Sequence, residues 1–225
     1  MTFDRLPVFP LPLVLLPGAT IPLHIFEPRY RRMLADCLAG DRRFGIVLSG
    51  EDGEDSAVRA HAVGCIADIV RTEELPDGRS NVVVQGGQRF ELLSLIETAT
   101  PYRVCRARSF DDDEVRDSAP LAALTALAER LRTVFQRVGA AARVLADDPD
   151  PLPSLPNDAA LLSFVIAAHI DLDLDTRQAL LASRSPLERL RQLDAVLTPA
   201  LGTLGSRAHV HTIAKTNGRG SHPHP

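Results

Sequence analysis

The sequence has a single lysine, no tryptophan and no closely spaced cysteines. Lys215 is the only lysine among 225 residues. A mechanism that requires a catalytic lysine inside the folded body therefore has no candidate in this sequence. The formal net charge of −4 argues against a general nucleic-acid binder, because such proteins usually carry a net basic face.

The three cysteines, Cys37, Cys65 and Cys105, are far apart and form no Cys-X-X-Cys motif. Their spacing suggests neither a zinc knuckle nor a redox pair. Each lies among apolar neighbours, which predicts buried free thiols in a reducing cytoplasm. The apolar stretch from Leu6 to Leu16 contains prolines, lacks a basic flank and is too short to span a bilayer. We therefore expect no signal peptide and a cytosolic protein.

The first half of the chain has the pattern of a β-rich fold. Prolines interrupt the opening apolar stretch, so it is expected to be an edge strand or an extended wrap. Short apolar runs predict further strands over residues 21–26, 44–48, 65–70, 81–84 and 102–110. The segment Leu75–Gly78 predicts a turn, because its proline presets φ and its glycine supplies positive φ. Gly86 and Gly87 interrupt the strand pattern and predict a bulge or a sharp bend.

One helix is expected within this half, from Pro28 to Gly40. Proline suits the first helical position and glycine suits the C-cap. Helical spacing gives the segment one apolar stripe, made of Tyr30, Met33, Leu34, Cys37 and Leu38. Short, bent strands closing around a single helix predict a small barrel-like sheet.

The second half has helical periodicity. The acidic run 111–114 predicts a solvated linker, and heptad spacing from Leu121 to Leu145 predicts a long helix packed against another helix. Prolines within residues 147–156 end it, and a largely apolar helix is expected over 158–169. Capping-box spacings start two more helices near Asp175 and Ser185. Pro199 and Gly202 are expected to end the last one.

These patterns predict an α+β fold with three parts. The first is a β-rich barrel-like subdomain over residues 1–114, and the second is a helical bundle over residues 115–202. A flexible tail is expected over residues 203–225, where glycine, serine, asparagine and histidine predominate.

The ordered features resemble the N-terminal domain of the Lon protease family. The resemblance begins with the proline-spaced run from Leu6, the Pro17-Gly18 turn and the strand from Ile21. It continues through the segments 27–30, 63–67, 75–78, 82–90, 167–169, 177–181 and 188–190. It thus covers about residues 5–200. The resemblance implies a PUA-like pseudo-β-barrel followed by a helical bundle, and a role in contacting substrate polypeptides or partner proteins.

The catalytic features of full-length Lon proteins are missing from this sequence. No GxxxxGK[ST] motif occurs, so there is no phosphate-cradling loop. A Ser-Lys peptidase needs a lysine in a folded site, whereas Lys215 lies in the expected tail. We therefore expect a non-catalytic recognition module without ATPase or peptidase activity, with no catalytic residue, no cofactor and no metal.

Two alternative functions remain open. An orphan hydrolase would draw on histidines such as His24 and His61, although no G-x-S-x-G elbow occurs. An RNA-binding PUA-like module would use a cluster of arginines, for which a solvated helix face is the favoured interpretation. That cluster comprises Arg29, Arg31, Arg32, Arg42 and Arg43. Nucleic acid is therefore an unexpected partner, and Gly86-Gly87 is no dinucleotide fingerprint because no helix pattern follows it.

The remaining histidines favour structural interpretations. His169 is expected to cap its helix or lie in the core, rather than to bind a ligand. Four histidines, His209, His211, His222 and His224, lie in the expected tail, where solvation is favoured over metal binding.

A polypeptide partner would use an exposed strand edge or an apolar groove. The proline-rich start with Phe9 and Leu11, and a cleft between barrel and bundle, are the expected places. The sequence does not assign partner-binding residues or an oligomeric state, and it predicts no membrane contact.

Overall fold

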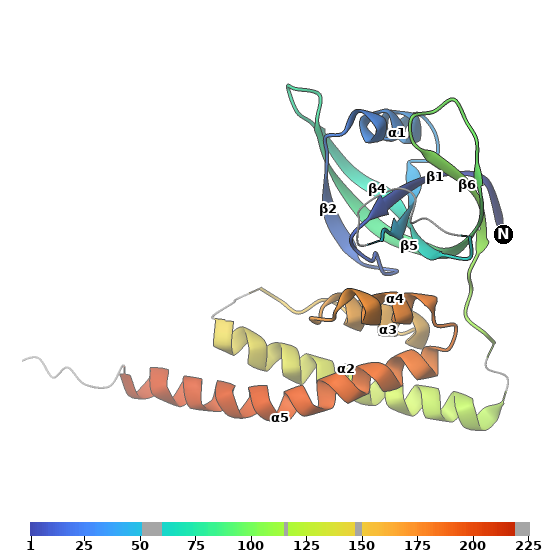
Figure 1. Cartoon of the computed structure of the whole chain (residues 1–225). Helices are drawn as coiled ribbons and strands as arrows, with labels where there is room; N and C mark the ends of the chain where they lie inside the picture. The colour runs from blue at the N-terminus through green and yellow to red at the C-terminus, as the bar shows by residue number, and fades with distance from the viewer. Residues whose placement is uncertain (51–59, 115–116, 147–149, 219–225) are drawn as a thin grey trace, which may run out of the picture. The chain divides into compact units, whose positions relative to one another are not determined.

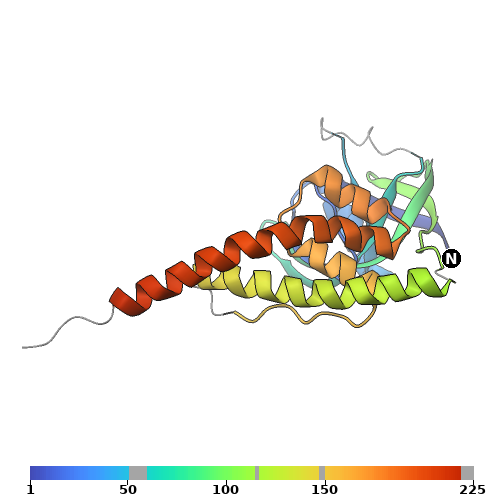
Figure 2. The same ribbon diagram turned by 90° about the horizontal axis from the view of Figure 1, so that it is seen from below.

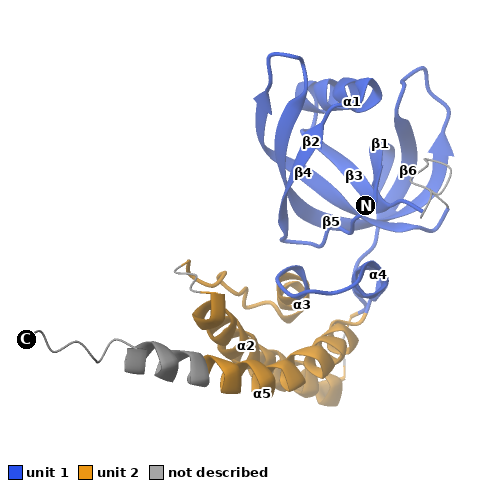
Figure 3. Cartoon of the chain, turned by 60° about the vertical axis from the view of Figure 1, so that its left-hand side comes forward, with its two compact units in different colours: residues 1–113, 167–184 blue, residues 114–166, 185–225 orange. Residues whose placement is uncertain are grey.

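The computed structural model describes residues 1–50, 60–114, 117–146 and 150–218, of which 209–218 are described by their backbone alone. The chain forms two compact units, residues 1–113 with 167–184 and residues 114–166 with 185–225 (Figure 3). The segment 167–184, which the sequence placed in the helical subdomain, thus belongs to the β-rich unit. The sequence from Glu51 to Ser56 is acidic and contains glycine, which predicts a loop, and this segment lies outside the described residues.

The first unit is built on a mixed sheet, and the fold class is α+β as predicted. Its strands are β1 (Thr2–Leu11), β2 (Thr20–Ile25), β3 (Arg43–Leu48), β4 (Val63–Glu74), β5 (Ser80–Ile96) and β6 (Arg103–Ser109). The strand order is β2-β5-β4-β3-β1-β6, and β6 also pairs with β5. Five strands therefore close into a ring, to which β2 is added at β5 (Figure 1).

The predicted helix is α1 (Pro28–Ala39), which lies across one open end of the ring (Figure 1). Its expected apolar stripe is largely buried, with Tyr30, Met33, Leu34 and Cys37 in the core. The left-handed residue after the helix is Arg42, with φ 55°, whereas Gly40 has a negative φ. The Arg42 N–H donates to the Cys37 carbonyl at 2.9 Å, so the chain turns sharply out of α1 into β3.

The turn between β4 and β5 has the predicted chemistry. Gly78 adopts φ 78°, and its N–H donates to the Leu75 carbonyl at 2.8 Å. The Arg79 N–H donates to the Asp77 carboxylate at 3.1 Å. Opposite the Gly86–Arg89 segment, the register of β4 shifts between Cys65 and Ala67, as expected for a bulge.

The core of the ring is centred on Phe90, which is fully buried with its apolar neighbours Leu6, Val8, Val47, Ile66, Leu92, Cys105 and Ala107. Two glycines make room for its ring. A Cβ on Gly45 or on Gly64 would lie 2.6 Å from the Phe90 Cζ atom. The strands therefore approach this ring more closely than any side chain at those two positions would permit.

Segment 167–184 is fastened to the sheet by buried Arg89. It contains α4 (Leu174–Ala182), whose Gln178 side chain donates to the Val63 carbonyl at 3.0 Å. Arg89 donates to the carbonyls of Leu181 and Ser183 at 2.8 and 2.6 Å. Its other terminal nitrogen lies 2.5 Å from Asp112. Because these partners are far apart in sequence, the contact explains why the segment joins the β-rich unit.

The second unit is helical. It contains α2 (Ser118–Ala146), most of α3 (Ala159–Ala168) and α5 (Pro186–Gly218). Helices α2 and α5 lie side by side, as both views show (Figures 1 and 2). Fully buried Arg189 of α5 donates to the Ser163 hydroxyl of α3 at 2.8 Å and lies over the Phe164 ring at 4.1 Å.

The expected end of the last helix at Pro199 and Gly202 is wrong. Helix α5 continues through Pro199 to Gly218. The flexible tail predicted over residues 203–225 is therefore wrong for 203–218, and residues 219–225 lie outside the described part of the chain. The physical reason is an apolar stripe that continues at helical spacing beyond the proline, through Leu197, Leu201, Leu204 and Ala208. Leu197 and Ala208 are buried and Leu201 and Leu204 are partly buried, and this packing supports the helix against the lost hydrogen bond and the steric clash that proline causes.

Candidate functional site

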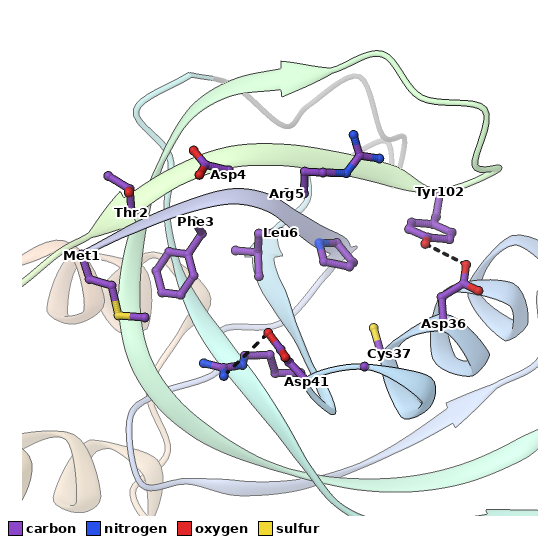
Figure 4. A pocket seen from close by; sticks show the side chains of 13 residues that line it. Met1, Thr2, Phe3, Asp4, Arg5, Leu6, Asp36, Cys37, Asp41 and Tyr102 are labelled. Atoms are coloured by element: carbon purple, nitrogen blue, oxygen red, sulfur yellow. Dashed lines mark hydrogen bonds and ion pairs between the residues drawn. The ribbon is translucent and has the colours of Figure 1, made fainter.

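A cavity of about 510 Å³ lies beside the N-terminal half of β1 (Figure 4). One wall is formed by residues 1–7. The other comes from the end of α1 and the turn into β3, with Asp36, Cys37, Gly40, Asp41 and Arg43, and Tyr102 lines it as well. We call this space the β1 cavity, and all its lining residues belong to the first unit.

The β1 cavity runs along an edge of the strand rather than over one of its faces. Successive side chains of a strand point to opposite faces, so a cavity over one face would touch every second residue. The β1 cavity instead touches seven consecutive residues, Met1 to Pro7. β1 lies between β6 and β3, which pair with its opposite edges. The edge toward β6 is paired from Thr2 to Val8, whereas the edge toward β3 is paired only from Val8 onward, so its first part is open.

The sharp turn at Arg42 is the local cause of this opening. The chain turns sharply at Arg42 just before β3, so the ladder between β3 and β1 begins at Val8, and no described residue of β3 is paired with residues 2–7 of β1. A bulge between Phe3 and Leu6 also bends β1 at this point. No pattern in the sequence predicts the turn at Arg42 or the bulge in β1.

Three titratable groups that line the β1 cavity have shifted pKa values, namely Asp36, Cys37 and Tyr102. Hydrogen bonds from Arg32 and Tyr102 hold the pKa of Asp36 below its usual value, so its carboxylate is ionised. The Tyr102 hydroxyl donates to Asp36 at 2.9 Å, and burial followed by this hydrogen bond raises the pKa of Tyr102 to about 12. Burial raises the pKa of Cys37 to about 12 as well. Neither the phenol nor the thiol is therefore activated as a nucleophile, since that requires a depressed pKa or an adjacent base.

Charges around the β1 cavity are mixed in sign. Arg43 lies 3.8 Å from Asp41, and Asp4 lies 3.9 Å from Arg106 on β6. The Arg43 Nε atom is buried and has no hydrogen-bond acceptor among the described residues. Such a wall offers hydrogen-bonding groups without a strong preference for one sign of charge.

The histidines considered for a hydrolase lie apart from each other and from this cavity. His24 Nδ1 lies 2.9 Å from the Asn81 side chain, on the pair formed by β2 and β5. His61 Nδ1 lies 2.7 Å from Glu91, whose other oxygen accepts from Arg108 at 2.8 Å. In the described residues, no serine hydroxyl is a hydrogen-bond partner of either ring. The structure therefore does not assemble the Ser-His-Asp arrangement there.

The arginine cluster considered for RNA is partly paired with acidic side chains. Arg29 contacts Glu27 at 2.9 Å, and Arg32 contacts Asp36 at 3.0 Å. Arg43 has its weaker contact with Asp41. Each of these pairs reduces the positive charge that phosphate groups would meet.

Other expected positions are also placed by the structure. Phe9 is buried against the Tyr30 ring, with 4.0 Å between centroids, so it belongs to the core rather than to a docking surface. Leu11 is partly buried. His169 follows α3 and is exposed, which excludes the core position predicted as one option. The side chains of His209, His211, His222 and His224 lie outside the described residues.

The three cysteines are free and buried, as predicted. Within the described residues, no group of three or more histidine, cysteine, aspartate or glutamate side chains is arranged to hold a metal ion. The helices of that same part of the chain include none with the length and apolar character needed to cross a membrane.

A family model, that of the ATP-dependent protease La (LON) substrate-binding domain, matches residues 5–198. Among curated relatives, Lon protease 2 of Herpetosiphon aurantiacus is 29% identical over 209 residues, which cover 92% of this chain and 25% of that protein. Lon protease of Parabacteroides distasonis is 38% identical over 102 residues, covering 44% and 12%. The chain thus spans about a quarter or less of the length of these relatives.

Two solved structures share the fold. A Lon N-terminal domain protein from Xanthomonas campestris is 28% identical, with a TM-score of 0.58 over 86% of this chain and 98% of that one. The N-terminal domain of a Mycobacterium avium complex Lon protease is 20% identical, with a TM-score of 0.60 over 87% and 98%. The second likeness concerns the fold alone.

Proposed function

Because the chain belongs to the ATP-dependent protease La (LON) substrate-binding domain family, we propose that it is a non-catalytic module that binds polypeptides or partner proteins. The observation that carries the proposal is the family match over residues 5–198, which includes both compact units except for their ends. The finer description, a PUA-like pseudo-barrel followed by a helical bundle in a cytoplasmic protein, is part of the same proposal. The ring of strands and the helical unit support it.

Three observations support the absence of catalysis within these residues. The sequence carries no P-loop motif, and its single lysine is Lys215. Burial raises the pKa of all three thiols, to about 12 for Cys37 and Cys105 and further for Cys65. A raised thiol pKa removes the thiolate that nucleophilic chemistry requires.

Polypeptide binding is favoured over RNA binding by the character of the open surface. An RNA site needs a basic stripe along the phosphate backbone, often with aromatic side chains for stacking. The arginine cluster is instead interrupted by Glu27, Asp36 and Asp41. The β1 cavity combines an open strand edge with apolar and polar side chains, which suits a peptide backbone.

The proposal is tested by the binding of a permanently unfolded polypeptide. Fluorescein-labelled α-lactalbumin that has been reduced and carboxymethylated is titrated with the chain, and fluorescence anisotropy is recorded. Native, disulfide-bonded α-lactalbumin with the same label is the matched control. We expect saturable binding of the unfolded form and none of the native form. Equal behaviour of the two forms, or no change with either, would contradict the proposal.

A further inference from the structure

We propose that the β1 cavity binds an extended polypeptide segment as an added β-strand, hydrogen-bonded to the open edge of β1 from Thr2 to Arg5. This inference rests on the polypeptide-binding function proposed above and specifies how that binding occurs. The occupant is an extended segment that pairs with these four residues, which span about 13 Å at about 3.3 Å per residue.

The backbone of β1 offers hydrogen-bonding groups on the side of the cavity. The Met1 carbonyl accepts from the Ser109 N–H at 2.8 Å, so the first residue directs its backbone groups toward β6. Alternate residues of a strand direct their backbone groups to opposite edges. Thr2 therefore directs its N–H and carbonyl away from β6, to the edge that gains a described strand partner only at Val8. Unpaired groups of this kind are a template for another strand.

The outer edge of β2 is less suitable for strand addition. Gly86 N–H donates to the Ala19 carbonyl at 2.8 Å, which directs residue 19 toward β5. By the same alternation, Thr20, Pro22 and His24 direct their backbone groups to the outer edge. Pro22 has no N–H, so it interrupts the donors in the middle of this edge, a common protection of edge strands.

The far half of β4 also has an open edge, but α1 lies beside it. Thr72 and Glu74 line a cavity together with Leu34 and Leu38 of the helix. A helix beside a strand edge is another way in which proteins prevent pairing with a second chain. The edge of β1 from Thr2 to Arg5 contains no proline, and the space beside it is the β1 cavity, whose other wall includes Asp36 and Cys37 of α1. The bulge between Phe3 and Leu6 bends this edge at its end.

The β1 cavity has the room and the side chains for this occupant. A paired strand lies about 4.8 Å from its neighbour, and the facing wall includes Gly40, which has no side chain. The cavity wall includes buried Leu6 and Cys37, and Phe3, which packs against the core. These residues suit the apolar side chains of an alternating segment. The mixed charges around the cavity do not favour a peptide of either net charge. Recognition therefore rests on backbone hydrogen bonds and on a peptide whose apolar and polar side chains alternate.

The first test uses methylation of the backbone of a peptide. The probe is a fluorescein-labelled hexapeptide of alternating valine and threonine, flanked by lysines for solubility. Two derivatives carry N-methyl groups, one at positions two and four and the other at positions three and five. Only alternate N–H groups of an added strand face β1, so one derivative should bind about tenfold or more weaker while the other retains most of its affinity.

The second test uses a matched pair of variants. Thr2→Pro removes an N–H from the open edge of β1, whereas Thr20→Pro removes one from the outer edge of β2. Proline is tolerated at edge positions, and circular dichroism with thermal melting verifies that both variants fold. We expect Thr2→Pro to weaken binding of the unmethylated hexapeptide about fivefold or more, because one hydrogen bond is lost and the ring obstructs the edge. Thr20→Pro should bind as the unmodified chain does.

The possible outcomes separate this inference from the proposed function. Binding that is equally weakened by both methylation patterns and unaffected by Thr2→Pro overturns strand addition, while binding of unfolded α-lactalbumin would still uphold polypeptide recognition. Absence of hexapeptide binding overturns it too. Pairing of β1 between two copies of the chain would appear in sedimentation as a dimer that Thr2→Pro dissociates and the hexapeptide does not, and this result also excludes the proposed occupant.

Discussion

Replacing Arg89 by methionine should loosen the segment that contains α4 from the sheet of the first unit. Methionine preserves much of the apolar stem but removes the guanidinium. The change removes the hydrogen bonds to the Leu181 and Ser183 carbonyls, at 2.8 and 2.6 Å, the ion pair with Asp112 and the contact with the Phe110 ring. The Arg89 side chain is only 5% exposed, so water cannot replace these contacts without local opening.

The expected cost follows from the burial of the two partners. Removing one member of a buried ion pair costs about 3–5 kcal/mol, because the other charge is left without compensation. The Asp112 side chain is 20% exposed and is partly solvated after the change. We therefore expect a loss of about 2–4 kcal/mol in the free energy that holds the segment closed.

Arg184 provides the matched control. Its guanidinium lies over the same Phe110 ring, at 5.0 Å compared with 5.1 Å for Arg89. It is 50% exposed, lies 3.6 Å from Asp113 and donates one hydrogen bond to the Asp111 carbonyl at 2.9 Å. An exposed pair of this kind contributes at most about 1 kcal/mol. Arg184→Met should therefore have a small effect.

Hydrogen–deuterium exchange of the amides in α4 measures this local opening directly. We expect exchange in α4 to accelerate strongly in Arg89→Met and only slightly in Arg184→Met. Equal changes in the two variants, or a change below about 1 kcal/mol in Arg89→Met, would refute the argument that the buried arginine fastens this segment.

Three further predictions concern packing, pH and the last helix. Gly64→Ala places a Cβ 2.4 Å from the Ile46 carbonyl oxygen, so it should lower the free energy of urea unfolding by about 1–3 kcal/mol. A Cβ at Gly202 would have no atom within 4 Å, so Gly202→Ala should raise the free energy of unfolding by about 0.5–1 kcal/mol through α5. Hydrogen bonds from His61 and then Arg108 lower the pKa of Glu91 in the folded state. The ionised carboxylate therefore contributes its full stabilisation above the ordinary glutamate pKa of about 4.3. This contribution is lost as the pH falls through the lowered pKa of the folded state. The stability difference between the unmodified chain and Glu91→Gln, measured by urea unfolding, should accordingly be largest near neutral pH and shrink in acid; a difference independent of pH would exclude this contribution. Pro199→Ala should increase the helical circular dichroism signal and the melting temperature, because α5 passes through this residue; no change would contradict a continuous helix.

Local patterns predicted most of the fold. The stripe of α1 and the Leu75–Gly78 turn depend on residues close in sequence, and the structure has both. Helix α5 shows where such reasoning fails. Pro199 and Gly202 are residues that commonly end helices, but α5 continues through both of them. The apolar stripe along this helix is buried or partly buried, and its packing supports the continued helix.

The candidate site depends on features that one sequence does not display. The β1 cavity exists because the pairing of β1 with β3 begins only at Val8, which leaves the preceding edge open. The register between strands is a long-range property that one sequence does not display. The role of Arg89 was equally hidden, since its carbonyl partners lie more than ninety residues away. An arginine in a strand usually indicates a solvated face, and only the fold shows that this one is buried.

The central claim, that the chain recognises polypeptides through the β1 cavity, is tested most directly by hydrogen–deuterium exchange with and without reduced, carboxymethylated α-lactalbumin. We predict slower exchange of the amides in residues 2–6 and 36–43 when the unfolded polypeptide is present, and no such change with native α-lactalbumin. Protection confined to other residues would contradict the assignment of the cavity. Absence of protection at every amide would contradict polypeptide recognition itself.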